Sequence, residues 1–221
     1  MNSCDSLERH FSTSVCDVVG NRYESAARLL LPVPDNSGQA LPWSALIPNT
    51  PLTVNTSWAS IKHLTGRDID PPYAYLRPEA AERLTYALAQ GRDPLCWFAL
   101  WKGYAEVLQE LPPVPAPPPD LLSLIRTAIE PLTVPDARPT GALLLQEPLS
   151  WLTRHAGELG CRAPLLIHAA DGGFTAACPT YHDSIYLGGS RRFIEQVIAS
   201  RPETFEIELD SPIPGSGEIL D

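Results

Sequence analysis

The sequence has few basic residues for its acidic content, and this shortage limits the partners that we expect. Sixteen lysines and arginines stand against 26 aspartates and glutamates, which gives the 221 residues a formal net charge of -10. Binding to a phosphate backbone depends on a basic surface that releases counterions, so we do not expect nucleic acid as a partner. The most apolar stretch is too short to cross a membrane, so we expect no membrane partner either.

Cysteine pairs of the metal-binding kind are also lacking. The count is odd, without a Cys-x-x-Cys pair or a zinc-type spacing of cysteine and histidine; the positions are Cys4, Cys16, Cys96, Cys161 and Cys178. We therefore expect neither a metal site nor a cofactor. Residues 1–10 lack a basic start followed by an apolar run, and this predicts a cytoplasmic protein with free thiols.

The most apolar and aromatic stretch runs from Leu95 to Trp101, between Asp93-Pro94 and Lys102-Gly103. Seven consecutive apolar residues are typical of a strand that is buried on both faces. Trp97 and Trp101 are four residues apart, which places them on the same face of such a strand. We predict a central strand over residues 95–101 that supplies the structural core residues Trp97, Phe98, Leu100 and Trp101.

The first half of the chain predicts an arm and a helical lobe. Residues 1–20 show no clear period and are expected to form a flexible arm, and residues 21–111 a lobe of helices and loops around the core strand. Helical spacing predicts a helix from Tyr23 to Leu31 and another that opens at Pro78 and is capped at Gly91. Residues 104–111 fit either a short helix or an extended edge.

Proline is abundant, and its densest run divides the chain. The sequence has 24 prolines, about twice the usual share of ~5%. Six of them lie in residues 112–119, which favours an extended polyproline II linker. The alternative is a ligand for a proline-recognising domain, but such segments most often act as spacers.

Residues 120–210 predict an α+β lobe, followed by an acidic tail at 211–221. Strands are expected at 142–146, 164–169, 174–178, 183–187 and 204–209, with helices at 120–129, 147–159 and 191–200. Asp171-Gly172-Gly173 predicts a tight hairpin between two of these strands. The fold class is therefore α+β: a mixed, partly antiparallel sheet with flanking helices and proline-rich loops.

Two blocks of the sequence resemble a family of uncharacterised, mainly actinobacterial proteins. They are Cys96 to Tyr104, which begins Cys-Trp-Phe-Ala-Leu-Trp, and Asp183 to Ser190, which ends Tyr-Leu-Gly-Gly-Ser. The resemblance extends from about residue 22 to 210 and implies a bacterial protein, but it brings no known activity. Members of the family usually have a tryptophan-rich, acidic stretch before the second block, and residues 165–178 have no tryptophan.

The strongest candidate site is Gly188-Gly189-Ser190-Arg191-Arg192. A glycine turn from a strand into a helix exposes backbone N–H groups at the positive end of the helix dipole, and two arginines add charge. This pattern favours a small anionic ligand. The same residues also suit any tight strand-to-helix turn capped by serine, and they match neither a Walker loop nor a dinucleotide-binding loop.

A catalytic set is not assigned from the sequence. His168 and Cys178 lie on neighbouring predicted strands and are the nearest approach to a nucleophile with a base. His182 and Asp183 are adjacent, so they point to opposite faces of a strand and do not form a dyad there.

The composition favours a non-catalytic, acidic protein-binding module over an enzyme. Such a module, for example an immunity or regulatory protein, covers a basic surface of another protein. The alternative is an enzyme or sensor that binds a small anionic ligand at the turn from Gly188 to Arg192. A third hypothesis is a structural subunit.

Overall fold

The computed structural model describes residues 13–34, 39–66, 72, 74–101, 120–121, 123–125, 142–157, 159, 161–179 and 182–213. The predictions for residues 1–12, for the proline-rich linker at 112–119 and for residues 214–221 fall outside this part of the chain. Helices and a largely antiparallel sheet occur together, so the predicted α+β class is confirmed.

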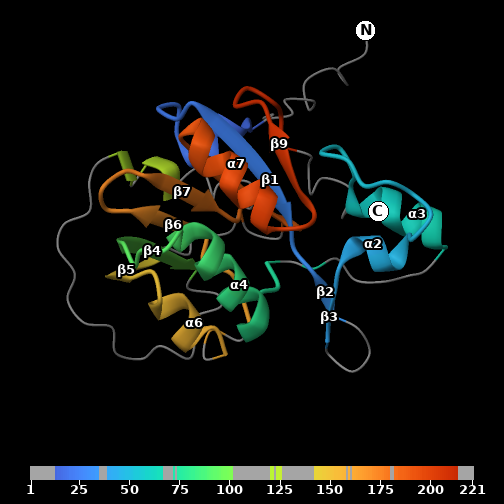
Figure 1. The fold of residues 1–221 in the computed structure, drawn as a ribbon, viewed down its shortest axis with the longest axis horizontal. Coiled ribbons are helices and arrows are strands. Elements are labelled where there is room, and N and C mark those ends of the chain that lie inside the picture. Colours follow the sequence, from blue (N-terminus) through green and yellow to red (C-terminus); the bar gives the residue numbers. More distant parts are fainter. Residues whose placement is uncertain are drawn as a thin grey trace, which may run out of the picture.

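Seven strands form one sheet in the order β5-β4-β6-β7-β8-β1-β9 (Figure 1). All neighbouring strands in it run antiparallel. Their bounds are β1 Ser25–Leu30, β4 Leu95–Trp101, β5 Ala142–Pro148, β6 Leu166–Ala169, β7 Phe174–Ala177, β8 Ser184–Gly189 and β9 Thr204–Ile207. The predicted core strand is β4, which pairs on both sides but lies next to the edge strand β5 rather than at the centre.

The sheet joins the two lobes that the sequence suggested. β1 and β4 come from residues 21–111, whereas the other five strands come from residues 120–210. β1 lies between β8 and β9, and β4 lies between β5 and β6. The two ranges therefore share one sheet, because long-range strand pairing inserts each of the early strands between late ones.

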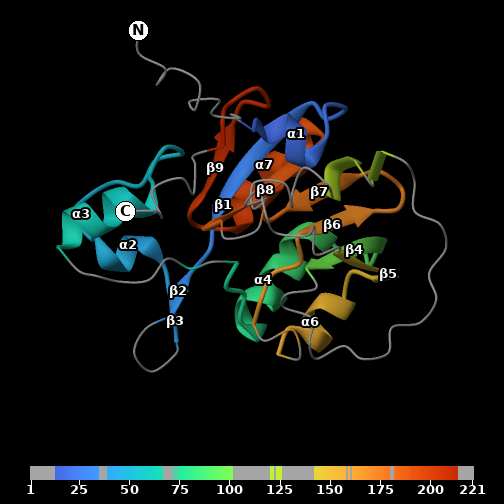
Figure 2. The ribbon, with the colours of Figure 1, turned by 180° about the vertical axis from the view of Figure 1, so that it is seen from behind.

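Helices cover both faces of this sheet. The helices with bounds in the described residues are α1 Val15–Val19, α2 Trp43–Leu46, α3 Trp58–Thr65, α4 Pro78–Ala89, α6 Trp151–His155 and α7 Arg191–Ser200. α4, α6 and α7 pack on one face and α1 on the other, as Figure 2 shows from behind. A small two-stranded sheet, β2 Val33–Pro34 and β3 Ala40–Leu41, lies beside α2 and α3.

Two predictions for the first thirty residues are wrong. The expected helix from Tyr23 to Leu31 is instead strand β1, whose six residues are all buried. Layers on both sides of the sheet cover β1, with Ala27 and Leu29 in the core under α7 and Ala26 in the core under α1. Its apolar residues therefore need not alternate, and here they imitate helical spacing. The expected arm over residues 1–20 includes α1, in which Val15, Val18 and Val19 are fully buried.

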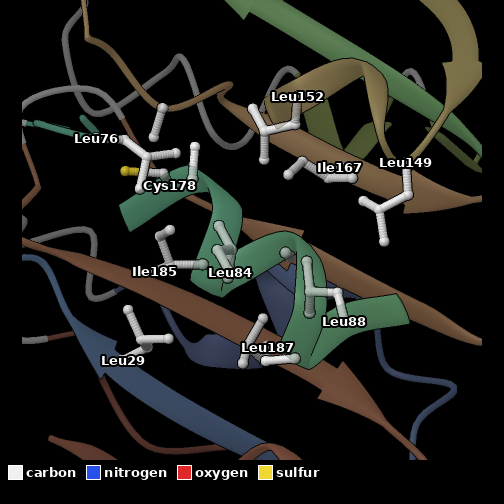
Figure 3. Close-up of a cluster of buried hydrophobic side chains, with 14 of the residues drawn as sticks. Leu29, Leu76, Leu84, Leu88, Leu149, Leu152, Ile167, Cys178, Ile185 and Leu187 are labelled. Atoms are coloured by element: carbon white, nitrogen blue, oxygen red, sulfur yellow. The ribbon is translucent and has the colours of Figure 1, made fainter. Parts of the chain in front are cut away.

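The larger core lies between the sheet and the helices α4, α6 and α7. Figure 3 shows Leu84 and Leu88 of α4 next to Ile185 and Leu187 of β8. All four side chains are at most 2% exposed. Each fully buried leucine or isoleucine contributes roughly 1.5–3 kcal/mol of transfer free energy, so this layer is a main source of stability.

A smaller cluster attaches α2 and α3 to the sheet. The rings of Trp43 and Trp58 meet edge to face with their centroids 5.3 Å apart. Trp43 Nε1 donates to the carbonyl of Leu31 at 2.8 Å, at the end of β1. Trp43 and Trp58 therefore pack α2 and α3 onto the main body.

Candidate functional site

The glycines of the predicted anion site lie inside β8 rather than in a turn, which corrects that part of the prediction. A Cβ atom on Gly188 would lie 2.5 Å from the Tyr23 ring and 2.9 Å from Val19, and one on Gly189 would lie 2.6 Å from the Phe193 ring. Glycine in a strand interior often marks such a close approach. These two residues let α1, Tyr23 and α7 pack against the sheet.

The first turn of α7 already has acceptors for two of its amides. Ser190 Oγ accepts from the Phe193 N–H at 3.3 Å, as the predicted helix cap requires. The carboxylate of Glu24 accepts from the Arg191 N–H at 3.2 Å, so a side chain of the protein occupies the place of the expected anion. Recognition of an external anion near this turn must therefore rely on side chains.

A pocket of about 560 Å³ opens beside the start of α7. Three arginines line it, and each comes from a different part of the chain: Arg22 precedes β1, Arg92 lies in the turn between α4 and β4, and Arg192 is in the first turn of α7. Glu24 is the carboxylate in the lining. We call this the arginine pocket; it is a basic site on a chain whose net charge is -10.

The predicted site residues divide between two hollows. Ser190 and Arg192 line the arginine pocket, whereas Arg191 lines a neighbouring hollow of about 520 Å³ with Glu206, Glu208 and Asp210. Sequence reasoning missed Arg22 and Arg92. No spacing rule links residues 22, 92 and 192, and each arginine by itself resembles an ordinary surface residue.

Two of the three arginines of the pocket form weak ion pairs. Arg22 lies 3.7 Å from Asp120, and Arg92 lies 3.7 Å from Asp171. All four side chains are at least 43% exposed. Within the described ranges, no carboxylate forms an ion pair with Arg192. Exposed pairs of this kind contribute only about 0–1 kcal/mol, so a ligand can exchange with them at little cost.

A buried network of hydrogen bonds holds the Arg22 side chain in place. Its Nη2 atom donates to the Tyr23 hydroxyl at 3.1 Å and to His168 Nε2 at 3.0 Å. His168 Nδ1 and the Tyr23 hydroxyl both contact Thr175 Oγ1, at 2.8 and 2.7 Å. Because a guanidinium only donates, His168 Nε2 must accept, and the ring proton is on Nδ1.

The charge state of His168 agrees with this role. Burial, with a smaller contribution from the Arg22 guanidinium, lowers the pKa of His168 from 6.5 to about 4. The ring is therefore neutral near pH 7, as an acceptor for Arg22 must be. His168 and Thr175 position Arg22 at the pocket, although neither lines it.

The cysteine and histidine considered for catalysis do not meet. Cys178 lies in the core under α4, on the face shown in Figure 3. His168 pairs across the sheet with Trp97, whose side chain packs on the opposite face. Burial raises the pKa of the Cys178 thiol well above its ordinary value, which disfavours the nucleophilic thiolate.

A buried charge elsewhere in the sheet, Arg28, has a structural role. It is fully buried on β1, and its Nη1 atom donates to the carbonyls of Val54 and Thr56 at 2.7 and 2.9 Å. Its Nε donates to Ser184 Oγ at 2.9 Å, and its Nη2 lies 3.2 Å from Asp183 Oδ1. Arg28 therefore attaches the segment before α3 to the sheet.

Metal-binding clusters and membrane-spanning helices are both absent from the described residues. In this part of the chain, no group of three or more His, Cys, Asp or Glu side chains is arranged to hold a metal ion. No described helix is both long enough and apolar enough to cross a membrane.

Comparison with known proteins gives no match: no family model, curated protein or solved structure matches the chain.

Proposed function

We propose that the protein binds a small anionic ligand in the arginine pocket. The observation that supports this most is the convergence of Arg22, Arg92 and Arg192 on one hollow of an acidic protein. A guanidinium binds carboxylate and phosphate oxygens through charge-assisted hydrogen bonds. Arg22 and Arg92 have only weak, exposed ion pairs with Asp120 and Asp171, which an anionic ligand can replace.

The size of the pocket favours a ligand larger than a single inorganic ion. Sites for small organic ligands usually occupy roughly 300–1,000 Å³, and this pocket of about 560 Å³ lies within that range. Gln90 and Gln196 also line it and offer amide groups for further hydrogen bonds. A ligand with one or two phosphate or carboxylate groups on an organic body fits this lining.

The residues have separable roles in the proposed site. Arg22 is the most firmly placed, because Tyr23 and His168 accept its hydrogen bonds. Arg92 and Arg192 are exposed and adjust to the ligand. Glu24 holds the first amide of α7 and keeps a second anion from that position.

Calorimetric titration of the whole chain tests the proposal, with phosphate, pyrophosphate and a nucleoside monophosphate as probes. The variant Arg22→Gln/Arg92→Gln/Arg192→Gln removes the three charges, and Arg154→Gln removes one exposed arginine on α6 as a control. Hydrogen bonds to charged groups contribute ~1.5–3 kcal/mol each, so the triple variant should lose measurable binding. Equal affinities for the triple variant and the control would contradict the site.

A second candidate function is the acidic protein-binding module, and one observation favours it. Glu206, Glu208 and Asp210 gather around the hollow beside β9, the edge strand of the sheet. Such a surface would attract a basic protein through complementary charge. Reversing Glu206 and Glu208 to lysine should then abolish capture of that protein from a bacterial extract while leaving anion binding intact.

We also propose a cytoplasmic location. Cys16, Cys96, Cys161 and Cys178 are free thiols, which is consistent with a reducing compartment.

A further inference from the structure

A second pocket, of about 440 Å³, lies at the other end of α7. Its walls come from the end of β1, from β3, from α4 and from the segment after α7. Much of the lining is apolar: Leu30, Pro32, Ala40, Pro42, Ala80 and Pro202. The proline rings have fixed backbone angles, so these walls are largely preformed. We call this hollow the proline-walled pocket.

Two arginines line the same pocket. Arg83 comes from α4 and Arg201 directly follows α7. Neither makes a hydrogen bond or an ion pair with another described residue. Arg201 Nε is buried with no partner among those residues, and burial together with Arg83 lowers the pKa of Arg201. A desolvated cation beside a like charge is unfavourable until an anion joins it.

Of the glutamates in this pocket, Glu203 offsets only part of this cost: its charge raises the pKa of Arg201, but the net shift is still downward. Glu203 uses both carboxylate oxygens to accept from the backbone amides of Trp43 and Ser44 at 2.9 and 2.7 Å, at the start of α2. Glu79 and Glu82 are exposed on α4, and neither forms an ion pair in the part of the chain that is described. Their charges disfavour a ligand with several negative groups.

We propose that the proline-walled pocket binds a carboxylic acid with an apolar body. The carboxylate meets the terminal nitrogens of Arg83 and Arg201, and the apolar body lies against Leu30, Pro32 and Pro42. A single planar carboxylate matches the fork of a guanidinium, and the mainly apolar walls favour a hydrocarbon over a sugar or a nucleotide. This ligand class differs from that of the arginine pocket, which has three arginines and a more polar lining.

Titration with phenylpropionate tests the proposal, and phenylpropanamide and benzyl phosphate are the matched neutral and doubly charged probes. The acid should bind to the whole chain at least about tenfold more tightly than either analogue, since only the acid offers one charged carboxylate. Arg83→Gln should weaken binding of the acid by about tenfold, and Arg154→Gln should leave it unchanged. Arg83 is exposed on α4, so its substitution does not threaten folding.

Arg201 provides the second measurement. Arg201→Lys keeps the charge but loses the planar fork, so it should weaken the binding of phenylpropionate while still leaving the acid bound more tightly than the amide. Equal binding of the acid and the amide would overturn the proposal, because the pocket would then be only apolar. Failure of all three probes to bind, or unchanged binding by both arginine variants, would overturn it as well.

Discussion

The two faces of the seven-stranded sheet bury different kinds of side chain. The face under α4, α6 and α7 is filled mainly by aliphatic and aromatic residues such as Leu84, Phe98 and Leu187. The face under α1 also holds the buried arginine Arg28 and the buried histidine His168. The two faces therefore have different roles. One face supplies most of the buried apolar area that stabilises the fold, and the other holds Arg22 in position at the arginine pocket.

The largest expected effect tests the apolar face. Phe98→Ala removes a fully buried ring from β4 that contacts Trp151 with centroids 5.1 Å apart. The cavity should lower the free energy of unfolding by about 3–5 kcal/mol. Denaturant titration measures this loss, with Leu95→Ala as a control because Leu95 is 46% exposed on the same strand. A loss below about 1 kcal/mol would show that this face is not the main core.

Acid should weaken the polar face. The pKa of His168 is about 4 in the folded state against an ordinary value of 6.5, so the unfolded chain binds more protons as the pH falls below 6.5. The contribution of His168 is complete above pH 6.5 and is lost progressively toward pH 4. Between pH 7 and 5 the loss should reach about 2 kcal/mol, from 1.36 kcal/mol per pKa unit.

Unfolding curves across this pH range measure the effect. His168→Gln should flatten the dependence, whereas His63→Gln, which replaces an exposed histidine on α3, should not. The same dependence on pH in both variants would show that His168 does not cause the loss of stability in acid. His182 adds to the slope in the wild type, because burial also lowers its pKa.

A smaller loss of stability is expected when a methyl group is added on the polar face. Gly188→Ala places a methyl group within 2.5 Å of the Tyr23 ring on the polar face. Overpacking of this kind costs typically 1–3 kcal/mol, and here it also displaces the residue next to Arg22. We expect a lower thermal midpoint together with weaker anion binding. Gly66→Ala is no suitable control because of its positive φ, but Gly157→Ala, whose Cβ would meet only Pro78 at 4.0 Å, is one.

The smallest expected effect on stability belongs to the pocket surface. Arg192→Gln removes an exposed side chain with no ion pair among the described residues, so the free energy of unfolding should change by less than about 0.5 kcal/mol. Anion affinity should nevertheless fall by about tenfold. A large loss of stability would mean that Arg192 supports the fold rather than a ligand.

The sequence predicts local structure well where one pattern dominates. The strand β4, the hairpin of β6 and β7 and the helix α7 are found close to their predicted bounds, because apolar runs, Asp171-Gly172-Gly173 and the cap Ser190 are strong local signals. β1 was missed because its strand partners β8 and β9 are more than 150 residues away in the chain. Periodicity alone does not reveal such pairing.

The candidate site is predictable only in part for a related reason. Ser190 and Arg192 follow from the local motif, and both line the arginine pocket. Arg22 and Arg92 reach the pocket only through the folding of β1 and the turn after α4, which no local pattern specifies. The cap by Glu24 was also hidden, because it joins residues that are 167 positions apart.

The most direct test of the arginine pocket is an NMR titration of the isotope-labelled protein with pyrophosphate. We expect the largest amide shifts at Gly172, Gly173 and Gln196, which line the pocket, and their loss in Arg22→Gln/Arg92→Gln/Arg192→Gln. Shifts confined to other parts of the molecule, or none at any concentration that keeps the protein folded, would contradict the proposed function.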